Sequence, residues 1–440
     1  MRARYLADAV VTVDAAGSVH RPGALDVEDG VIRWVGPLAE APPGPVEEFR
    51  LGGLVMPGLV NTHAHTPMTL VRSAGDGLPL DRWLREAVWP REAALSGDDV
   101  HWGMLLGCDE LLCAGVTTTC EMYLQGQMVL DAALEAGIRC LLTPGVFDLP
   151  GAGLSWEQCL EDARRLHRDY DGRSGLVTVG VGPHSAYLLP TSALVAVGAL
   201  AAETGGLIQI HLAETREEGQ RIEATHGCSA PVLLEKLGLL EQRVLAAHSV
   251  WLSEADLDIY VRNDVAVAHC PQSNGKLGSG VARVAEMLAR GLRVGLGTDG
   301  PASNDNLDLW EELRLAPLLA RAVAADPTAI GTADALVLAT RGGAEALGLP
   351  TGSLEPGRHA DFIRLDMEDP VFVPTIDDTE LVAHLVWAAG SRLVTDVWVG
   401  GRQVVRDRTC TTVDAATVCR EAATRARRLA RHGRPQHARP

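Results

Sequence analysis

Two histidines one residue apart, His63 and His65, end the strand-like run LVMPGLVNTHAH. Residues that alternate along a β-strand point to the same face, so both imidazoles can reach one metal ion. Three further polar residues each close an apolar, strand-like run: His211 in LIQIHLAET, His248 in VLAAHS and Asp299 in RVGLGTDG. Imidazole nitrogens with one carboxylate suit Zn²⁺ or Fe²⁺, and a catalytic site keeps one position open for water. The pattern predicts a mononuclear metallohydrolase.

Such a site needs a fold that brings the ends of several strands together. A barrel of parallel strands gathers them at its C-terminal face, where catalytic residues sit. Apolar runs alternate with helical patterns along the middle of the chain, as a parallel α/β barrel requires. The insert of residues 66–100 follows the first strand, and we expect it to wall the substrate pocket. Eight strands are predicted, near residues 55–63, 115–121, 138–147, 175–184, 207–212, 244–249, 265–269 and 293–299.

The two ends of the chain predict a second, smaller domain. At 440 residues and 46.7 kDa, the chain exceeds the roughly 250 residues of a typical barrel. Strand-like segments precede and follow the barrel, with tight turns predicted at Asp29-Gly30 and Gly400-Gly401. The predicted fold is α/β, a (β/α)8 TIM-type barrel with a β-sandwich built from both termini. Its predicted parts are residues 1–56 and 353–418 for the sandwich, 57–352 for the barrel, and 419–440 for a terminal helix and basic tail.

Composition excludes several classes of protein. A net charge of −18 opposes binding to a phosphate backbone, so no nucleic-acid partner is expected. No stretch approaches the roughly 20 apolar residues of a membrane span, and the N-terminal MRARYLADAV predicts no secretory signal. The nine cysteines form no C-x-x-C pair and are typical of buried thiols in a reducing compartment. We therefore expect a cytoplasmic protein without a membrane partner.

The motifs resemble those of a known family. PGLVNTHAH, HLAET, AAHS and GTDG are similar to the amidohydrolase superfamily, and MTLVRSAGDGLPLDRWLREAVWPRE resembles its methylthioadenosine/S-adenosylhomocysteine deaminase and triazine hydrolase branch. The resemblance covers nearly the whole chain. It implies a proton-shuttling Glu214 and a hydroxide-orienting His248, and we expect a homo-oligomer, a dimer or a tetramer. It implies one divalent metal, Zn²⁺ first and Fe²⁺ as the alternative, with the ligands His63, His65, His211 and Asp299.

These residues together predict a hydrolytic deamination. Water bound to a divalent metal drops in pKa from 15.7 to about 7, which gives a nucleophile at neutral pH. Glu214 lies three residues beyond His211 and could carry a proton from the attacking water to a ring nitrogen of the substrate. Asp299 could act both as a ligand and as the group that passes a proton to departing ammonia. The alternatives are a helix-start carboxylate for Glu214 and a core histidine for His248.

Lysine is almost absent, and this bears on the number of metals. Related amidohydrolases with two metals bridge them by a carboxylated lysine on the fourth strand. The corresponding GLVTVGVGPHSAYLL contains none, and Lys236 and Lys276 are the only lysines of the chain. A dinuclear amidase such as a dihydroorotase is therefore disfavoured. The H-x-E and P-C-x-x-C motifs of the other zinc deaminase class are also missing.

The resemblance also implies contacts with a nucleoside. Trp83 would pack near the substrate, Glu92 would bind the ribose hydroxyls, and His184 would meet the base or the sugar. A carboxylate can accept hydrogen bonds from two neighbouring hydroxyls, which suits Glu92 to a ribose. The alternatives are an apolar helix face for Trp83 and a solvated helix position for Glu92. Ser303 and Asn304 are expected to shape the pocket floor.

One segment departs from the family pattern. Members acting on S-adenosylhomocysteine use arginines after the third strand for the amino acid carboxylate, but LLTPGVFDLPGAGLS has none, and Pro144 stands where an arginine is expected. Arg72 or an arginine of a neighbouring subunit could replace that contact. The prediction is an aminohydrolase acting on an adenosine with a small or uncharged 5′ group.

Two other functions compete with this prediction. The first is hydrolytic removal of an amino or chloro group from a free heterocycle such as guanine, cytosine or a triazine. Loss of Glu92 would discriminate, because it should harm a ribose substrate and spare a free base. The second is a non-catalytic metal-binding or scaffold protein. A closed structural site would need no acid beside it, so Glu214 next to a complete ligand set argues against a scaffold.

Overall fold

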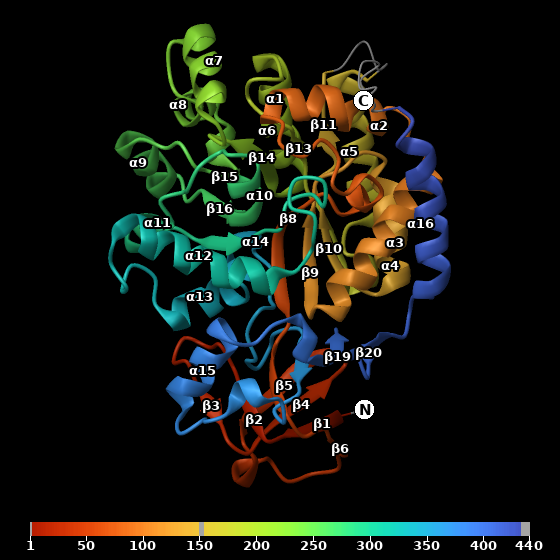
Figure 1. Ribbon diagram of the computed structural model, residues 1–440, viewed down its shortest axis with the longest axis vertical. Coiled ribbons are helices and arrows are strands. Elements are labelled where there is room, and N and C mark those ends of the chain that lie inside the picture. Colours follow the sequence, from red (N-terminus) through yellow and green to blue (C-terminus); the bar gives the residue numbers. More distant parts are fainter. Residues whose placement is uncertain (1, 149–153, 433–440) are drawn as a thin grey trace.

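The structure is a computed structural model that describes residues 2–148 and 154–432. Figure 1 shows a large body of strands and helices above a smaller group of strands, with the N-terminus in the smaller group. Strands from the two ends of the chain lie side by side there, so the middle of the chain forms the large body. The organisation is α/β.

Parallel strands run through the middle of the large body. They form one sheet in the order β12-β10-β9-β8, a second in the order β14-β15-β16-β17, and a short pair β11-β13, and every pairing is parallel. Single bridges join Val181 to Ile208 and Ala64 to Asp299, which connect one sheet to the other at both edges. The strands are β8 (Leu59–Ala64), β9 (Val116–Glu121), β10 (Arg139–Leu142), β11 (Gly145–Val146), β12 (Val177–Val179), β13 (Gly182–Pro183), β14 (Ile208–Leu212), β15 (Val244–His248), β16 (Ala266–His269) and β17 (Val294–Leu296).

Helices follow most of these strands and cover them. Several begin at side-chain caps, as Ser96 does for α3 and Ser253 for α9, where each serine forms a capping box with the aspartate three residues on. The helices are α3 (Gly97–Cys113), α4 (Gly126–Ala136), α5 (Trp156–Tyr170), α6 (Thr191–Thr204), α7 (Arg216–His226), α8 (Ala230–Lys236), α9 (Glu254–Arg262), α10 (Pro271–Lys276), α11 (Val284–Ala289), α12 (Leu309–Ala324), α13 (Thr332–Leu338) and α14 (Arg341–Leu347).

The insert after the first central strand is largely helical. It contains a 3-10 segment (Thr66–Val71), the short helix α1 (Leu80–Arg82), a π-helical segment (Trp83–Val88) and α2 (Trp89–Glu92), and it leads into α3. The side chains of the 3-10 segment are all buried, so the insert packs on the body rather than extending from it.

A seven-stranded sheet combines the two ends of the chain, in the order β21-β20-β19-β18-β7-β2-β3. A four-stranded sheet, β5-β4-β1-β6, comes from the N-terminal segment alone. The predicted turns are present, since Asp29, Gly30, Gly400 and Gly401 all have positive φ. The strands are β1 (Arg2–Ala7), β2 (Ala9–Val11), β3 (Val19–His20), β4 (Gly23–Glu28), β5 (Val31–Pro37), β6 (Glu47–Arg50), β7 (Leu54–Pro57), β18 (Phe362–Leu365), β19 (Val394–Val399), β20 (Arg402–Arg406) and β21 (Thr409–Cys410).

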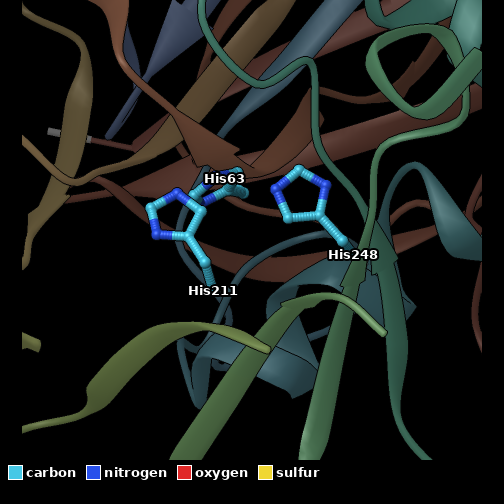
Figure 2. A group of neighbouring side chains, drawn as sticks. All are labelled: His63, His211 and His248. Atoms are coloured by element: carbon cyan, nitrogen blue, oxygen red, sulfur yellow. The ribbon is translucent and has the colours of Figure 1, made fainter. Parts of the chain in front are cut away.

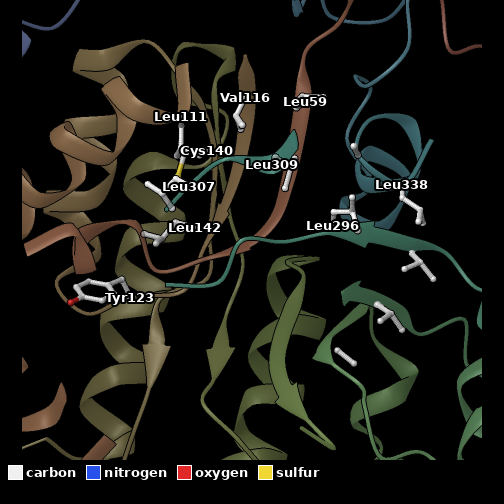
Figure 3. Packing of buried hydrophobic residues seen from close by; sticks show 14 of the residues in the cluster. Leu59, Leu111, Val116, Tyr123, Cys140, Leu142, Leu296, Leu307, Leu309 and Leu338 are labelled. Carbon is white, nitrogen blue, oxygen red and sulfur yellow. The ribbon is translucent and has the colours of Figure 1, made fainter. Parts of the chain in front are cut away.

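The hydrophobic cores match this division. One small cluster joins Tyr5 and Leu25 of the four-stranded sheet to Phe362 and Trp398 of the seven-stranded sheet. A large cluster fills the space between the central strands and their helices (Figure 3), with Leu59 on β8, Val116 on β9 and Leu111 on α3 among its members. The tight packing holds the strand ends, and therefore the residues on them, in fixed positions.

The C-terminal segment returns to the large body. Helix α15 (Asp378–Trp387) lies beside α13, and α16 (Ala415–Leu429) packs along α3 (Figure 1) through Ala422 and Leu429. The helix predicted within 419–440 thus begins four residues before that range, at Ala415, and residues 433–440 of the predicted basic tail lie outside the described part. Within residues 2–148 and 154–432, no helix is both long and apolar enough to cross a membrane.

The predicted strands are present, with differences at three of them. The run 55–63 is two strands, because β7 belongs to the terminal sheet and β8 to the central one. The chain crosses between them at Gly58, where a Cβ atom would lie 2.1 Å from Thr117. The runs 138–147 and 175–184 are each divided into two short strands, the latter at Gly180, where a Cβ atom would meet the carbonyl of Leu207 at 2.2 Å.

Candidate metal and catalytic site

The five polar residues that end strand-like runs lie in one place. One ligand atom from each of His63, His65 and Asp299 lies within 4.8 Å of the others, and the same is true of His63, His211 and His248. Nε2 of His65 is 3.2 Å from Nε2 of His211 and 3.3 Å from Oδ1 of Asp299. Figure 2 shows the rings of His63, His211 and His248 around one space. The structure thus brings together all four residues that the sequence suggested as ligands.

Backbone carbonyls orient two of these imidazoles. Nδ1 of His65 lies 2.5 Å from the carbonyl oxygen of Met122, and Nδ1 of His211 lies 2.7 Å from that of His184. A carbonyl only accepts hydrogen bonds, so each Nδ1 carries a proton, and in the neutral ring, the form that binds a metal, each Nε2 presents a lone pair. Two lone pairs facing each other at 3.2 Å repel unless a cation lies between them.

His63 gives a second indication that a metal fits. It is fully buried, and neither ring nitrogen has a hydrogen-bond partner among the described residues. Burial lowers the pKa of His63 to about 4, so its imidazole is neutral at pH 7 and available as a ligand. Nε2 of His63 is 3.4 Å from Oδ1 of Asp299. Three neutral imidazoles and one carboxylate form a donor set that suits a divalent metal such as zinc.

Asp299 is fixed by two hydroxyls on the oxygen that points away from the histidines. The hydroxyls of Ser273 and Ser303 lie 2.6 Å and 2.8 Å from Oδ2, while Oδ1 faces His63 and His65. Asp299 also has a left-handed backbone, with φ +57°. A non-glycine residue in this region is strained, and such residues concentrate at functional sites.

Glu214 and His248 lie beside this cluster. Oε2 of Glu214 is 3.9 Å from Nε2 of His248, while Nδ1 of His248 is 2.9 Å from Oδ1 of Asn274. Burial raises the pKa of Glu214, and His248 partly opposes this. Helix α7 begins only at Arg216 with Thr215 as its cap, so Glu214 precedes the helix and lines the cavity instead of stabilising the first turn. A buried carboxyl with a raised pKa next to a histidine can accept and return a proton.

The remaining predicted contacts line the same cavity. Trp83 is buried and donates from Nε1 to the carbonyl of Ala74 at 2.7 Å, and the ring of His184 lies 4.6 Å from that of His211. Burial raises the pKa of Glu92, an effect that the nearby Tyr123 hydroxyl opposes. The predicted site residues that line the cavity are His65, Trp83, Glu92, His184, His211, Glu214, His248, Asp299 and Ser303.

Asn304 does not line this cavity. Its side-chain amide donates to the carbonyl of Thr298 and to Glu312, both at 2.8 Å, so it braces the segment behind Asp299. The prediction that it shapes the pocket floor is wrong for this reason. Ser303 does line the cavity and is bonded to Asp299.

Sequence reasoning missed several residues of the site. Tyr123 lies two residues beyond the end of β9 and lines the cavity, so the strand-end rule could have found it. Phe147 follows β11 and packs against His184 with ring centroids 5.2 Å apart and the two ring planes tilted by 49°. Asn274 and Ser279 lie in a glycine-rich stretch whose contacts with His248 and Glu214 leave no periodic signal. The predicted insert does wall the cavity, through Met68, Leu80, Trp83, Leu84, Val88, Trp89 and Glu92.

The sequence is similar to a known protein family and to several proteins named as nucleoside deaminases. The sequence profile of the Amidohydrolase family matches residues 54–404. A 5-methylthioadenosine/S-adenosylhomocysteine deaminase of Pelotomaculum thermopropionicum is 41% identical over 429 residues, which cover 96% of this chain and 97% of the relative. A 5'-deoxyadenosine deaminase of Methanothermobacter thermautotrophicus is 39% identical over 395 residues, covering 89% and 91%.

Solved structures agree with the sequence comparison. The crystal structure of an adenosine deaminase from Xanthomonas campestris with bound zinc superposes with a TM-score of 0.93 at 33% identity, covering 97% of this chain and 98% of that one. The match extends over the terminal sheets as well as the central strands.

Proposed function

The chain belongs to the amidohydrolase family, and on that premise we propose that it is a metal-dependent aminohydrolase acting on an adenosine-type purine nucleoside. Adenosine, 5′-deoxyadenosine and 5′-methylthioadenosine are the substrates we expect. Water adds to the ring carbon that bears the amino group, ammonia leaves, and the inosine form results. The observation that carries the proposal is one cavity lined by His65, His211, Asp299, Glu214 and His248, with the buried His63 beside the first three. The names of the deaminase relatives support it.

The proposed metal ligands are His63, His65, His211 and Asp299. A divalent metal held there would act as a Lewis acid and lower the pKa of water toward about 7. We propose one metal per chain, with Zn²⁺ first because the Xanthomonas neighbour binds zinc, and Fe²⁺ as the alternative. The central strand around residues 177–183 carries no lysine that could bridge a second metal.

The chain's own residues handle the protons in this proposal. Glu214 takes a proton from the attacking water and delivers it to a ring nitrogen, since its carboxyl lies in the cavity and has a raised pKa. Burial lowers the pKa of His248, but the carboxylates of Glu214 and Asp299 more than offset this, so the charged ring can donate from both nitrogens. Its Nδ1 donates to Oδ1 of Asn274, which holds the ring in place, and its Nε2 donates a hydrogen bond to the attacking oxygen. Asp299 takes the proton that remains on the added oxygen and passes it to the amino group, which leaves as ammonia while the carbonyl forms.

The substrate contacts follow from the cavity lining. We propose that Glu92 binds the ribose hydroxyls, that Trp83 packs against the nucleoside, and that His184 meets the base or the sugar. Ser303, which lines the cavity next to Asp299, would form the wall of the pocket beside the base. Glu92 separates this proposal from the alternative of a free aminoheterocycle such as guanine, cytosine or a triazine, because a free base offers no ribose for its carboxylate.

The architecture is proposed in finer detail as well. We propose that the central strands close into a (β/α)8 barrel, which the two bridges between the central sheets support. The two terminal sheets, with their shared cluster of buried side chains, support a β-sandwich. The proposed domains are residues 1–56 with 353–418, residues 57–352, and residues 419–440. A homo-oligomer and a cytoplasmic location stay predictions.

An ammonia-release assay tests the proposed function. Purified zinc-loaded protein would be given adenosine, 5′-deoxyadenosine and 5′-methylthioadenosine in parallel with guanine, cytosine and aminotriazines. Ammonia release with conversion of the nucleosides to their inosine forms is expected. Release from a free base or a triazine without turnover of any nucleoside would replace the nucleoside assignment with the alternative.

A further inference from the structure

We propose that Glu121, at the end of strand β9, is the buried counter-charge of the metal site and positions the turn that carries His65. The inference rests on the proposed function only in assuming a divalent metal at the four proposed ligands. Glu121 does not line the cavity, and its side-chain hydrogen bonds are with Thr66 and Thr119 and not with a proposed ligand. It would act through other residues, so it is a positioning residue and not a catalytic one.

The surroundings of Glu121 are unusual for a carboxylate. Its exposed fraction is 0%. Its Oε1 accepts hydrogen bonds from the hydroxyls of Thr66 and Thr119, each at 2.6 Å, and its Oε2 accepts one from the N–H of Thr66 at 2.9 Å. All three donors are neutral, and no cationic side chain of the described ranges forms an ion pair with it. A buried carboxylate with no cation is costly, because hydrogen bonds from neutral groups only partly replace its hydration.

Glu121 is directly linked to the proposed metal ligands. In the parallel pairing of β8 with β9, it lies opposite Ala64, the residue between His63 and His65. Thr66, which gives it two hydrogen bonds, follows His65 immediately. Met122, which follows Glu121 in the sequence, accepts a hydrogen bond from Nδ1 of His65 at its carbonyl oxygen. Glu121, the last residue of β9, and Met122 directly after it therefore fix the turn from Ala64 to Thr66.

A charge count explains why an acid occupies this position. Three neutral imidazoles and the Asp299 carboxylate leave a net charge of +1 around a divalent cation. A second carboxylate close behind the ligands offsets this charge of the metal and its four ligands inside a region of low dielectric, where uncompensated charge is most costly. Glu121 and the metal would thus compensate each other, and each would be less stable in the protein without the other.

The test is zinc affinity and thermal stability of Glu121→Gln, which keeps the shape and removes the charge. The zinc dissociation constant would be measured by competition with a chromophoric chelator, and the melting temperature with and without zinc. Residues that support metal ligands typically contribute 10- to 100-fold in affinity, so zinc should bind about 10- to 100-fold more weakly. The zinc-loaded variant should melt at a lower temperature than the zinc-loaded wild type. The metal-free variant should melt no lower than the metal-free wild type.

Asp256→Asn is a matched control. Asp256 is also buried, and it too accepts only from neutral donors, the hydroxyls of Ser229 and Ser253 and the N–H of Ser253. It completes the capping box of α9 with Ser253 and has no link to the ligands, so its loss should lower the melting temperature of both forms equally and leave the zinc dissociation constant unchanged. The same behaviour in Glu121→Gln would overturn the proposal and leave Glu121 a structural anchor.

A second variant keeps the test decisive if Glu121→Gln does not fold. Glu121→Asp retains the charge while shortening the side chain, so it should bind zinc within a few-fold of the wild type. A 10-fold or greater loss in Glu121→Asp would contradict the charge argument. These readouts do not involve turnover, so the inference can fail while deamination is observed. If zinc binding depends on Glu121 but no nucleoside is deaminated, the proposed substrate is wrong and the role of Glu121 stands.

Discussion

The hydroxyl of Ser279 donates a hydrogen bond to Oε1 of Glu214 at 3.2 Å, which leaves Oε2 as the oxygen that faces His248 at 3.9 Å. Ser279 is itself held, because Trp251 donates from Nε1 to its carbonyl at 2.7 Å and its own N–H donates to the carbonyl of Asn274 at 2.8 Å. Asn274 also holds the ring of His248. One short segment after β16 therefore fixes both groups proposed to handle protons.

Replacing Ser279 with alanine should slow the reaction and shift its pH dependence. Burial raises the pKa of Glu214 and the Ser279 hydroxyl lowers it, so losing the hydroxyl should raise this pKa further. Glu214 must be ionised to take a proton, so the acidic limb of kcat/KM should move to higher pH. A hydrogen bond to a charged group contributes about 1.5–3 kcal/mol, so on the acidic limb, where Glu214 is mostly protonated, kcat/KM should fall at least about tenfold.

Ser353→Ala is the control for this substitution. Ser353 is buried like Ser279, with 1% against 5% of its surface exposed, and its hydroxyl bonds to Glu355 outside the cavity. Its pH profile and kcat should match those of the wild type. A Ser279→Ala profile that coincides with the wild type would show that Glu214 needs no hydroxyl to hold it.

Glu214→Gln should abolish most turnover without unfolding the protein. General acid–base groups typically supply about 10²–10⁴-fold, and kcat should fall by that factor while zinc content and the circular dichroism spectrum stay unchanged. Glu217→Gln, at an exposed position of α7, is the matched control and should keep wild-type kcat. Wild-type turnover in Glu214→Gln would reduce Glu214 to a structural carboxylate.

The positions of strands and strand ends could be predicted from the sequence, and the contacts between loops could not. Parallel strands share one polarity, so residues such as His211 and Asp299 at their ends must meet at one edge, whatever the exact strand bounds. The break at Gly58 was missed because the apolar pattern runs through it without interruption, although the chain changes sheets there. The inside of the site depends on loops, where Ser279 reaches Glu214 across 65 residues of sequence.

Asn304 is a residue that the sequence placed in the site and the structure does not. It follows Asp299 closely in the sequence, which suggested the pocket floor. The helical turn after Asp299 directs neighbouring side chains to different places, so Ser303 bonds to Asp299 while Asn304 turns toward Glu312. Closeness to Asp299 in the sequence therefore predicted the role of Ser303 correctly and that of Asn304 wrongly.

Removal of the metal should abolish activity and lower stability. Dialysis against a strong chelator should leave inactive protein with a reduced melting temperature, because a ligand that binds only the folded state stabilises it. One equivalent of Zn²⁺ or Fe²⁺ should restore both. Elemental analysis of active protein is expected to give one metal per chain. A reproducible two metals per chain, both required for turnover, would contradict the mononuclear site.

Glu92→Ala should harm only substrates that carry ribose hydroxyls. The carboxylate can accept from two hydroxyls, so kcat/KM for adenosine should fall about 10- to 100-fold at roughly 1.5–3 kcal/mol. The same variant should handle 2′,3′-dideoxyadenosine as well as the wild type does. Glu86→Gln, on the same insert but paired with Arg82 outside the cavity, is the control. Equal losses on both substrates would mean that Glu92 supports the cavity instead of binding ribose.

The last prediction concerns the 5′ substituent, and it follows from the cations near the cavity. A second cavity adjoins the first through Glu92, Tyr123 and Phe147, and Pro144 and Asp148 of the segment after the third strand line it. Residues 149–153 of that segment lie outside the described part. Among the described residues that line it, the cations are Arg85 and Arg165, which pair with Asp81 and Asp162.

An amino acid carboxylate entering this cavity would therefore lose hydration without gaining a free cation. Arg72 does not replace the missing arginine, because its guanidinium binds Glu110 and the carbonyl of Asp305. We expect adenosine, 5′-deoxyadenosine and 5′-methylthioadenosine to be deaminated about 10- to 100-fold better than S-adenosylhomocysteine, the factor for one charge-assisted hydrogen bond. Side-by-side kcat/KM values at low salt would measure this, and Pro144→Arg should raise the value for S-adenosylhomocysteine alone. A wild-type preference for S-adenosylhomocysteine would mean that Arg85 or Arg165 leaves its aspartate to bind the carboxylate, and Arg85→Ala and Arg165→Ala would then show which one does.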